Sequence, residues 1–112
     1  MSSPTVSVVI PAYNQAPLLA RLLDSLAAMV NAPSFEVIIV DDASPDDTGA
    51  VVAAWIAAHP GVTCRYFRQD RNQGPGAARN CGVEEAHGEF VAFSDTDCVV
   101  SVHWLSALIA GF

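Results

Sequence analysis

The amino-acid sequence predicts an α/β domain in which helices cover both faces of a parallel sheet, giving three layers in the order α/β/α. Short β-branched runs alternate with longer segments of helical periodicity, so the expected element order is βαβαβαβα. Hydrophobic residues make up 52% of the 112 residues and charged residues only 15%, which favours a packed core. Because crossovers between parallel strands are right-handed, the helices are expected on both faces of the sheet. No internal boundary is visible in the sequence, so residues 1–112 are predicted to form one domain.

The first unit joins a strand over residues 6–11 to a helix over residues 16–30. The run VSVVIP is β-branched and ends at Pro11, which is typical of a buried strand. The helical segment repeats leucine so that one broad face is apolar. Asn14 is the expected N-cap, and Pro17 is tolerated in the first turn.

The second unit begins with the strand FEVIIV at residues 35–40, which stops at Asp41 and Asp42. Ser44 stands in a capping position, and Pro45 follows it. Because proline is favoured at the first helical position, a helix is expected to begin near residue 45.

Two further units complete the predicted sheet. A strand is expected over residues 62–69, where two arginines indicate a sheet edge. The glycine-rich segment 72–86 becomes helical, and a strand over residues 89–95 follows it. Ser101 is the expected cap of a last helix, which runs to the end of the chain.

The charged residues narrow the classes of function. The formal net charge is −7, and all five basic residues are arginines. Without lysine, the chain has neither a GxxxxGK[ST] phosphate loop nor a lysine for Schiff-base chemistry. Nucleic-acid binding is not expected, since its affinity comes mainly from clustered cations that neutralise phosphates.

Cysteines and hydropathy indicate the cellular setting. Cys64, Cys81 and Cys98 are odd in number and lack CxxC spacing, so neither a disulfide framework nor a zinc site is expected. No basic residue precedes the first apolar run, as it would in a signal peptide. No apolar stretch has the roughly 18–20 residues of a membrane span. The prediction is a cytoplasmic chain without a membrane span.

Polar residues follow three of the predicted strands. In open parallel sheets, ligands bind beyond the carboxyl ends of the strands. The groups that reach this edge are Ala12-Tyr13-Asn14, Asp41-Asp42 and Asp95-Thr96-Asp97. Two alternatives stay open: Asp42 could belong to a helix cap in a solvated loop, and Tyr13 could be a half-buried aromatic residue.

Asp95 and Asp97 form an acidic pair whose carboxylates repel each other, because only one residue separates them. An oxygen-preferring divalent cation would remove that repulsion, whereas a plain turn is the alternative. Arg79 lies in the first turns of the helix after the glycine-rich loop. It could pair with Asp42 or Asp95, or it could hydrogen-bond a base or a phosphate.

In this order the motifs resemble those of family 2 glycosyltransferases, which are inverting, nucleotide-sugar-dependent enzymes with a GT-A fold. The four similar segments are VSVVIPAYNQAPLLARLLDSL, EVIIVDDASPDDT, NQGPGAARNCGV and GEFVAFSDTD. They resemble the family's opening strand and helix, its VDDxSxDxT segment, its NxGxxxARNxG segment and the strand that ends in DxD. The resemblance implies a Rossmann-like sheet that forms the nucleotide-binding half of a GT-A domain.

The resemblance also implies roles for individual residues. Tyr13 would lie against the base, Asp42 would accept a hydrogen bond from a uracil or thymine imide, and Arg79 would assist at the base or the diphosphate. Asp95 and Asp97 would face the ribose and a Mn²⁺ or Mg²⁺ ion that bridges the diphosphate of the donor. The residues expected at the nucleotide sugar are Pro11, Ala12, Tyr13, Asp42, Arg79, Asp95, Thr96 and Asp97.

Two departures from the family pattern shape the expected activity. Cys98 stands where many relatives carry a further acid, a change expected to alter metal affinity or ligand geometry. The family's general base and acceptor-binding segments lie beyond Phe112, so the chain is expected to be the N-terminal part of a longer catalytic domain. Alone, it should bind a donor weakly and transfer no sugar to a saccharide or lipid-linked acceptor. The longer protein could associate with the inner face of the membrane.

Two other classes of protein share parts of this pattern. A receiver-like signalling module also has an acidic pair after a strand, but it needs an acceptor aspartate at the end of its third strand and a lysine. A noncatalytic nucleotide-binding or assembly domain would keep the fold without the chemistry. The apolar last helix and an incomplete sheet edge also favour self-association of the chain.

Overall fold

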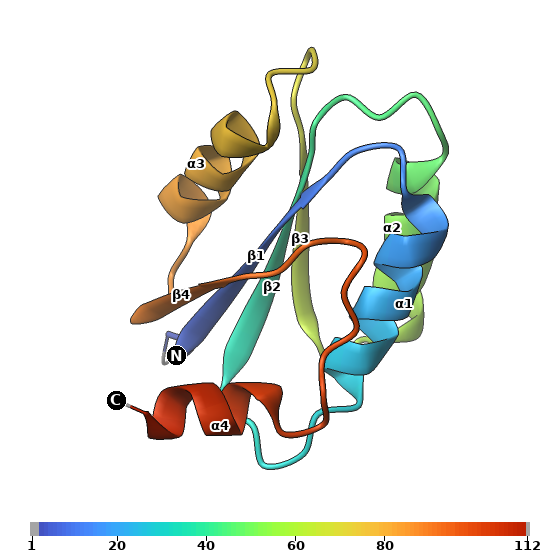
Figure 1. Ribbon diagram of the computed structural model, residues 1–112. Helices are drawn as coiled ribbons and strands as arrows, with labels where there is room; N and C mark the ends of the chain where they lie inside the picture. Colours follow the sequence, from blue (N-terminus) through green and yellow to red (C-terminus); the bar gives the residue numbers. More distant parts are fainter. Residues whose placement is uncertain (1–2, 112) are drawn as a thin grey trace.

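The computed structural model describes residues 3–111 and contains one parallel sheet with the strand order β3-β2-β1-β4 (Figure 1). The strands are β1 (Val6–Ala12), β2 (Phe35–Asp41), β3 (Thr63–Arg68) and β4 (Phe90–Phe93). The helices are α1 (Ala16–Ala27), α2 (Thr48–Ala58), α3 (Pro75–Glu85) and α4 (Trp104–Ala110). The chain therefore starts in the middle of the sheet, proceeds to β3 at one edge, and then returns to add β4 on the other side of β1.

Helices cover both faces of the sheet, so the predicted three-layer arrangement is confirmed (Figure 1). Side chains alternate along β1: Val8 and Ile10 pack with α1 and α2, whereas Val9 faces α3. The larger apolar cluster lies on the α1 and α2 face and also takes in Leu105 of α4. The smaller cluster joins Val9 to Ala78 of α3. Strands buried on both faces explain the continuous apolar runs in the sequence.

The packing of α3 against the sheet depends on Gly82, which lies directly over Val9. A Cβ atom at residue 82 would lie 2.3 Å from Cγ1 of Val9, well inside van der Waals contact. Glycine therefore lets the helix and the strand approach more closely than any other residue would allow.

A buried polar cluster closes the amino-terminal end of the sheet. Oε2 of Glu36 accepts hydrogen bonds from the Ser7 hydroxyl (2.6 Å) and from the His87 backbone N–H (2.7 Å). Oε1 pairs with the Arg65 guanidinium at 2.9 Å. Burial raises the pKa of Glu36, but these hydrogen bonds and the Arg65 charge outweigh it, so the pKa is lowered overall. The cluster ties β1, β2 and β3 to the turn between α3 and β4.

One edge of the sheet matches the prediction made from its arginines. The two arginines of the third predicted strand, Arg65 and Arg68, lie on β3, which is an edge strand. At the opposite edge, Val91 and Phe93 of β4 are exposed. Within the described part of the chain, none of the helices has both the length and the apolar character needed to cross a bilayer.

The predicted helix caps are wrong. The first helix has Gln15 in the N-cap position, and Asn14 instead adopts a left-handed conformation with a φ of 53°. The second helix begins at Thr48 rather than near residue 45, and its N-cap is Asp47 rather than Ser44. The hydroxyl oxygen of Ser44 accepts a hydrogen bond from the backbone N–H of Asn14, so it does not cap its own segment. In the last helix, His103 rather than Ser101 precedes the first turn.

Candidate nucleotide-sugar site

A pocket of about 330 Å³ opens beyond the carboxyl ends of the strands. It lies where the strand order reverses, because β1 and β4 are neighbours in the sheet but not in sequence. The last bond between the two strands runs from the Ser94 N–H to the Val9 carbonyl, and beyond it their chains separate. The residues that line the pocket are Pro11, Ala12, Tyr13, Gln15, Asp42, Pro75, Asp95, Thr96 and Asp97.

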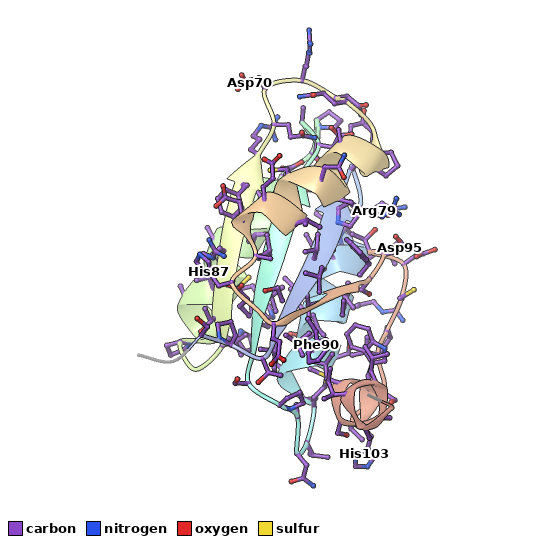
Figure 2. The ribbon with its side chains drawn as sticks, turned by 90° about the vertical axis from the view of Figure 1, so that its left-hand side faces the viewer. Asp70, Arg79, His87, Phe90, Asp95 and His103 are labelled. Atoms are coloured by element: carbon purple, nitrogen blue, oxygen red, sulfur yellow. The ribbon has the colours of Figure 1, made fainter. Side chains whose placement is uncertain are left out.

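All of the residues expected at the site line this pocket except Arg79. Figure 2 shows Arg79, on α3, beside Asp95, and Nη2 of Arg79 lies 3.5 Å from Oδ1 of Asp95. Of the partners considered from the sequence, the structure places Arg79 with Asp95 and not with Asp42. Both side chains of this pair are exposed, so their mutual attraction is weak in water. Tyr13 is 46% exposed, with its ring open to the pocket side of the sheet.

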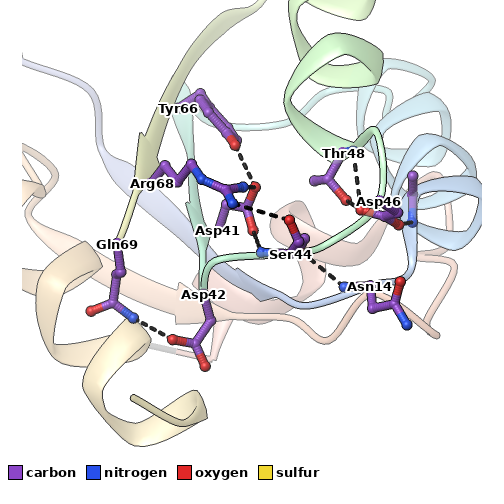
Figure 3. Close-up of polar contacts among 10 residues, drawn as sticks. Asn14, Asp41, Asp42, Ser44, Asp46, Thr48, Tyr66, Arg68 and Gln69 are labelled. Atoms are coloured by element: carbon purple, nitrogen blue, oxygen red, sulfur yellow. Dashed lines mark hydrogen bonds and ion pairs between the residues drawn. The ribbon is translucent and has the colours of Figure 1, made fainter. Parts of the chain in front are cut away.

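Asp42 is 3% exposed and does not cap α2, so the helix-cap alternative is wrong. Its Oδ1 accepts hydrogen bonds from the Gln69 side-chain amide (2.7 Å) and the Gln73 backbone N–H (2.7 Å). Its Oδ2 accepts one from the Gly74 N–H at 2.9 Å. The carboxylate therefore fixes the loop between β3 and α3 while it faces the pocket (Figure 3).

Asp41 has a different, structural environment and does not line the pocket. It is fully buried, and its carboxylate accepts hydrogen bonds from the Ser44 N–H (2.8 Å), the Tyr66 hydroxyl and the Arg68 guanidinium (3.1 Å) (Figure 3). Burial, together with the bond to Asp41, raises the pKa of Tyr66 to about 12. The buried charge is thus compensated by one cation and two neutral donors.

The loop after β2 also holds the loop after β1, which carries Tyr13. The Ser44 hydroxyl oxygen accepts a 3.0 Å hydrogen bond from the Asn14 N–H, and Oδ2 of Asp46 accepts one from the Ala16 N–H at 3.2 Å. Oδ1 of Asp46 accepts from the hydroxyl and the N–H of Thr48, and these bonds lower the pKa of Asp46. The acidic segment therefore holds the backbone of the loop that carries the pocket residues Tyr13 and Gln15.

The acidic segment after β4 forms a turn that presents its two carboxylates outward. The Cys98 N–H donates to the Asp95 carbonyl at 3.1 Å, so the plain-turn alternative describes the backbone correctly. The Asp95 side chain is 63% exposed and that of Asp97 is exposed too, and both line the pocket. Thr96, between them, also lines the pocket but is only 5% exposed.

The oxygen atoms of this turn suit a hard divalent cation. Among residues 3–111 there is no group of three or more histidine, cysteine or acidic side chains that would hold an ion by itself. Magnesium is commonly held by one or two carboxylates together with phosphate oxygens and water. Asp95 and Asp97 would supply the two carboxylates of such a site, and phosphate oxygens and water would supply the remaining ligands.

Gln15 and Pro75 are the lining residues that the sequence did not predict. Pro75 belongs to the glycine-rich loop, whose approach to this edge was expected. Gln15 follows Tyr13 and Asn14 directly, and its residue type carries no signal for a binding role. Its side-chain oxygen accepts a hydrogen bond from Thr96, which lies 81 residues away along the chain.

Comparison with known proteins agrees with this geometry. Residues 7–112 match Glycosyl transferase family 2. The succinoglycan biosynthesis protein ExoO of Rhizobium meliloti (strain 1021) is 40% identical over 106 residues, which make up 95% of this chain and 29% of that protein.

Two solved structures are similar in fold and sequence. The mannosyltransferase PcManGT from Pyrobaculum calidifontis, in complex with GDP-Man and Mn²⁺, aligns with a TM-score of 0.81 and 33% identity over 88% of this chain and 29% of that one. S. aureus TarS 1–349 in complex with UDP-GlcNAc aligns with a TM-score of 0.84 and 34% identity over 94% of this chain and 30% of that one.

The fold is an α/β domain of the glycosyltransferase class, with the GT-A architecture predicted from the motifs. The chain belongs to glycosyltransferase family 2. The receiver-like signalling module is therefore excluded. The chain spans about 30% of the length of the relatives described above.

Proposed function

We propose that this chain is the donor-binding part of a glycosyltransferase that uses a UDP- or dTDP-sugar and a divalent cation. The observation that carries the proposal is the convergence of Asp42, Asp95 and Asp97, from two different strands, on one pocket at the reversal of strand order. Relatives solved with UDP-GlcNAc and with GDP-Man and Mn²⁺ support this class of ligand.

The base is proposed to lie between Tyr13 and Asp42. The exposed face of Tyr13 offers an aromatic surface for stacking. Oδ1 of Asp42 already accepts two hydrogen bonds, whereas Oδ2 accepts one and keeps a lone pair for a further donor. An imide N–H of uracil or thymine is such a donor, and the pre-formed hydrogen bonds hold the carboxylate in place to receive it.

The diphosphate is proposed to lie near Asp95 and Asp97. A chain with a net charge of −7 and three carboxylates around one pocket repels an anionic ligand. Mn²⁺ or Mg²⁺, held by the two carboxylates, would neutralise the diphosphate and the charge that develops when it leaves. Arg79, 3.5 Å from Asp95, lies close enough to add a second positive charge at the same end.

Transfer of the sugar is proposed to require residues beyond this chain. An inverting displacement needs a base that deprotonates the acceptor hydroxyl, and no residue of the pocket is assigned to that role. We therefore propose that residues 1–112 form a single domain, the N-terminal part of a longer catalytic domain, acting on a saccharide or lipid-linked acceptor at the cytoplasmic side. Alone, the chain should bind the donor weakly and transfer nothing.

Calorimetric titration of the purified chain with UDP, dTDP and GDP, each with and without Mn²⁺, tests the proposed donor site. UDP or dTDP should bind at least tenfold more tightly with Mn²⁺, and Asp97→Asn should remove that difference. Glu84→Gln is the matched control, because it removes one exposed charge of α3 away from the pocket. Equal affinity with and without Mn²⁺ would contradict the metal site, and the absence of any nucleotide binding would favour a noncatalytic assembly domain.

An assay of sugar transfer tests the second part of the proposal. The purified chain is incubated with a panel of nucleotide sugars, Mn²⁺ and simple saccharide acceptors, and products are separated by mass spectrometry. No glycosylated product is expected from the chain alone. Clear transfer would show that the base and the acceptor site lie within residues 1–112.

A further inference from the structure

The acidic turn after β4 lies outside the sheet and needs another support. The last strand bond of this region is that from the Ser94 N–H to the Val9 carbonyl at 3.1 Å. Residues 95–103 then form neither strand nor helix. Among the described residues, the ion-pair partner of the Asp95 carboxylate is the exposed guanidinium of Arg79, at 3.5 Å. Contacts of this kind do not fix a flexible turn.

Hydrogen bonds at the start of α1, near its end and just beyond it hold the segment that follows β4. Figure 1 shows the chain after β4 running beside α1 toward α4. The Thr96 hydroxyl donates to the Gln15 side-chain oxygen at the start of α1. Farther along, the Val100 N–H donates to the Ser25 hydroxyl oxygen at 3.1 Å. Beyond the end of α1, the Val30 N–H donates to the Val102 carbonyl at 2.8 Å. Of these three bonds, the one with Thr96 lies at the pocket.

Gln15 lies where its side-chain oxygen can accept the hydrogen bond from Thr96. It occupies the N-cap position of α1 but makes no side-chain capping bond, and the next N–H, that of Ala16, donates to Asp46. The Gln15 carbonyl accepts a 2.9 Å hydrogen bond from the Leu19 N–H, which anchors the residue to the helix. The Thr96 hydroxyl, in a side chain only 5% exposed, would otherwise be buried without a partner.

We infer that Gln15 is a positioning residue of the donor site, which orients the acidic turn by binding Thr96; this inference rests on the proposed function of that turn. Thr96 lies between the two aspartates, inside the turn that the Cys98 N–H closes onto the Asp95 carbonyl. With Thr96 held against α1, Asp95 and Asp97 both face the pocket. A turn without this bond must be ordered when the cation and nucleotide bind, which weakens their affinity.

The test compares Gln15→Ala and Thr96→Val, which each remove one partner of the bond, with Thr96→Ser, which keeps the hydroxyl. The first readout needs no ligand: amide hydrogen exchange of Cys98, whose N–H closes the acidic turn. The second is the affinity for Mn²⁺ at saturating UDP. Both disruptive variants should speed Cys98 exchange several-fold and weaken Mn²⁺ binding by about 3- to 10-fold. Thr96→Ser should behave as the wild type.

Two controls separate positioning from loss of the fold and from failure of the proposed function. Amides of the central strands, such as Val8 and Ile38, should exchange as in the wild type, and the double variant should lose no more than either single one. Unchanged Cys98 exchange and Mn²⁺ affinity in Gln15→Ala, or additive losses in the double variant, would overturn the inference. Faster Cys98 exchange in a chain whose wild type binds no UDP with Mn²⁺ would support the Gln15–Thr96 link and reject the proposed function.

Discussion

The backbone N–H of Gly74 donates a 2.9 Å hydrogen bond to Oδ2 of Asp42, and this bond joins the start of α3 to the end of β2. Gly74 has a φ of 92°, a conformation that glycine adopts without strain. The same carboxylate lines the pocket. The residue proposed to recognise the base therefore also fixes the glycine-rich loop, so its substitution affects both stability and binding.

Asp42→Asn should lower the free energy of unfolding by about 1–3 kcal/mol, because the new amide presents N–H groups to one of the donors that the carboxylate now satisfies. The same variant should lose most of its affinity for UDP. Urea unfolding and calorimetry measure the two effects. Gln69→Ala is the control, since it removes one bond to Asp42 and leaves the charge, and it should keep UDP affinity within a few-fold. A stable Asp42→Asn chain with normal UDP binding would refute both roles.

Gly82→Ala should destabilise the fold by about 1–3 kcal/mol, because the new methyl group would lie 2.3 Å from Cγ1 of Val9. Gly76→Ala is the matched control in the same helix, where a Cβ atom meets nothing within 4 Å. Adding Val9→Ala to Gly82→Ala should recover part of the loss, because it removes the clashing methyl groups. Urea unfolding at neutral pH measures all four chains, and equal stability of Gly82→Ala and the wild type would show that α3 packs differently.

The element order and the three layers could be predicted from the sequence because they depend on local periodicity. Runs such as VSVVIP and the leucine repeat of α1 each report the burial of their own segment. The helix caps could not be predicted from the sequence. The Asn14 backbone N–H donates to the Ser44 hydroxyl oxygen, 30 residues away, and neither residue caps its own helix. The Ser44 side chain, of a type that prefers caps, instead binds the backbone of a neighbouring loop, which a single sequence does not record.

Glu36→Gln should lower the free energy of unfolding at neutral pH, and this difference from the wild type should disappear in acid. The pKa of Glu36 is lower in the folded protein than its ordinary value of 4.5, so its stabilising contribution is present well above pH 4.5. That contribution disappears as the pH falls through the folded-state pKa. The unfolding free energies of wild type and variant should therefore differ at pH 7 and converge as the pH falls below 4.5 and through the folded-state pKa. A difference that persists or grows in acid would contradict the buried, charged state of Glu36.

Thiol labelling of the native chain should show one fast phase, from Cys98. Burial raises the pKa of Cys64 to about 11 and also raises that of Cys81, whereas Cys98 is exposed. Cys98→Ser should remove the fast reaction with a disulfide reagent at pH 8. Because Sγ of Cys98 lies 3.8 Å from Oδ1 of Asp97, UDP with Mn²⁺ should also slow the reaction in the wild type. A fast phase that survives in Cys98→Ser would show that a buried thiol is accessible.

The candidate site was predictable to the extent that it lies at strand ends. Tyr13, Asp42 and Asp97 follow strands in the sequence, and parallel strands bring such residues to one edge. Arg79 was placed near the acids correctly, but it lies beside the pocket and not in its lining. Gln15 was missed, because its residue type carries no binding signal and its contact with Thr96 joins residues 81 positions apart.

Paramagnetic broadening of backbone amide signals by Mn²⁺, recorded by NMR with and without saturating UDP, locates the cation directly. With UDP present, substoichiometric Mn²⁺ should broaden the signals of Ala12, Thr96 and Asp97 first, and those near Glu36, at the opposite end of the sheet, last. Asp97→Asn should abolish this selective broadening, whereas Glu84→Gln should leave it unchanged. Broadening that centres on Glu36, or that is uniform over the chain, would contradict a cation-assisted nucleotide site at the carboxyl ends of β1 and β4.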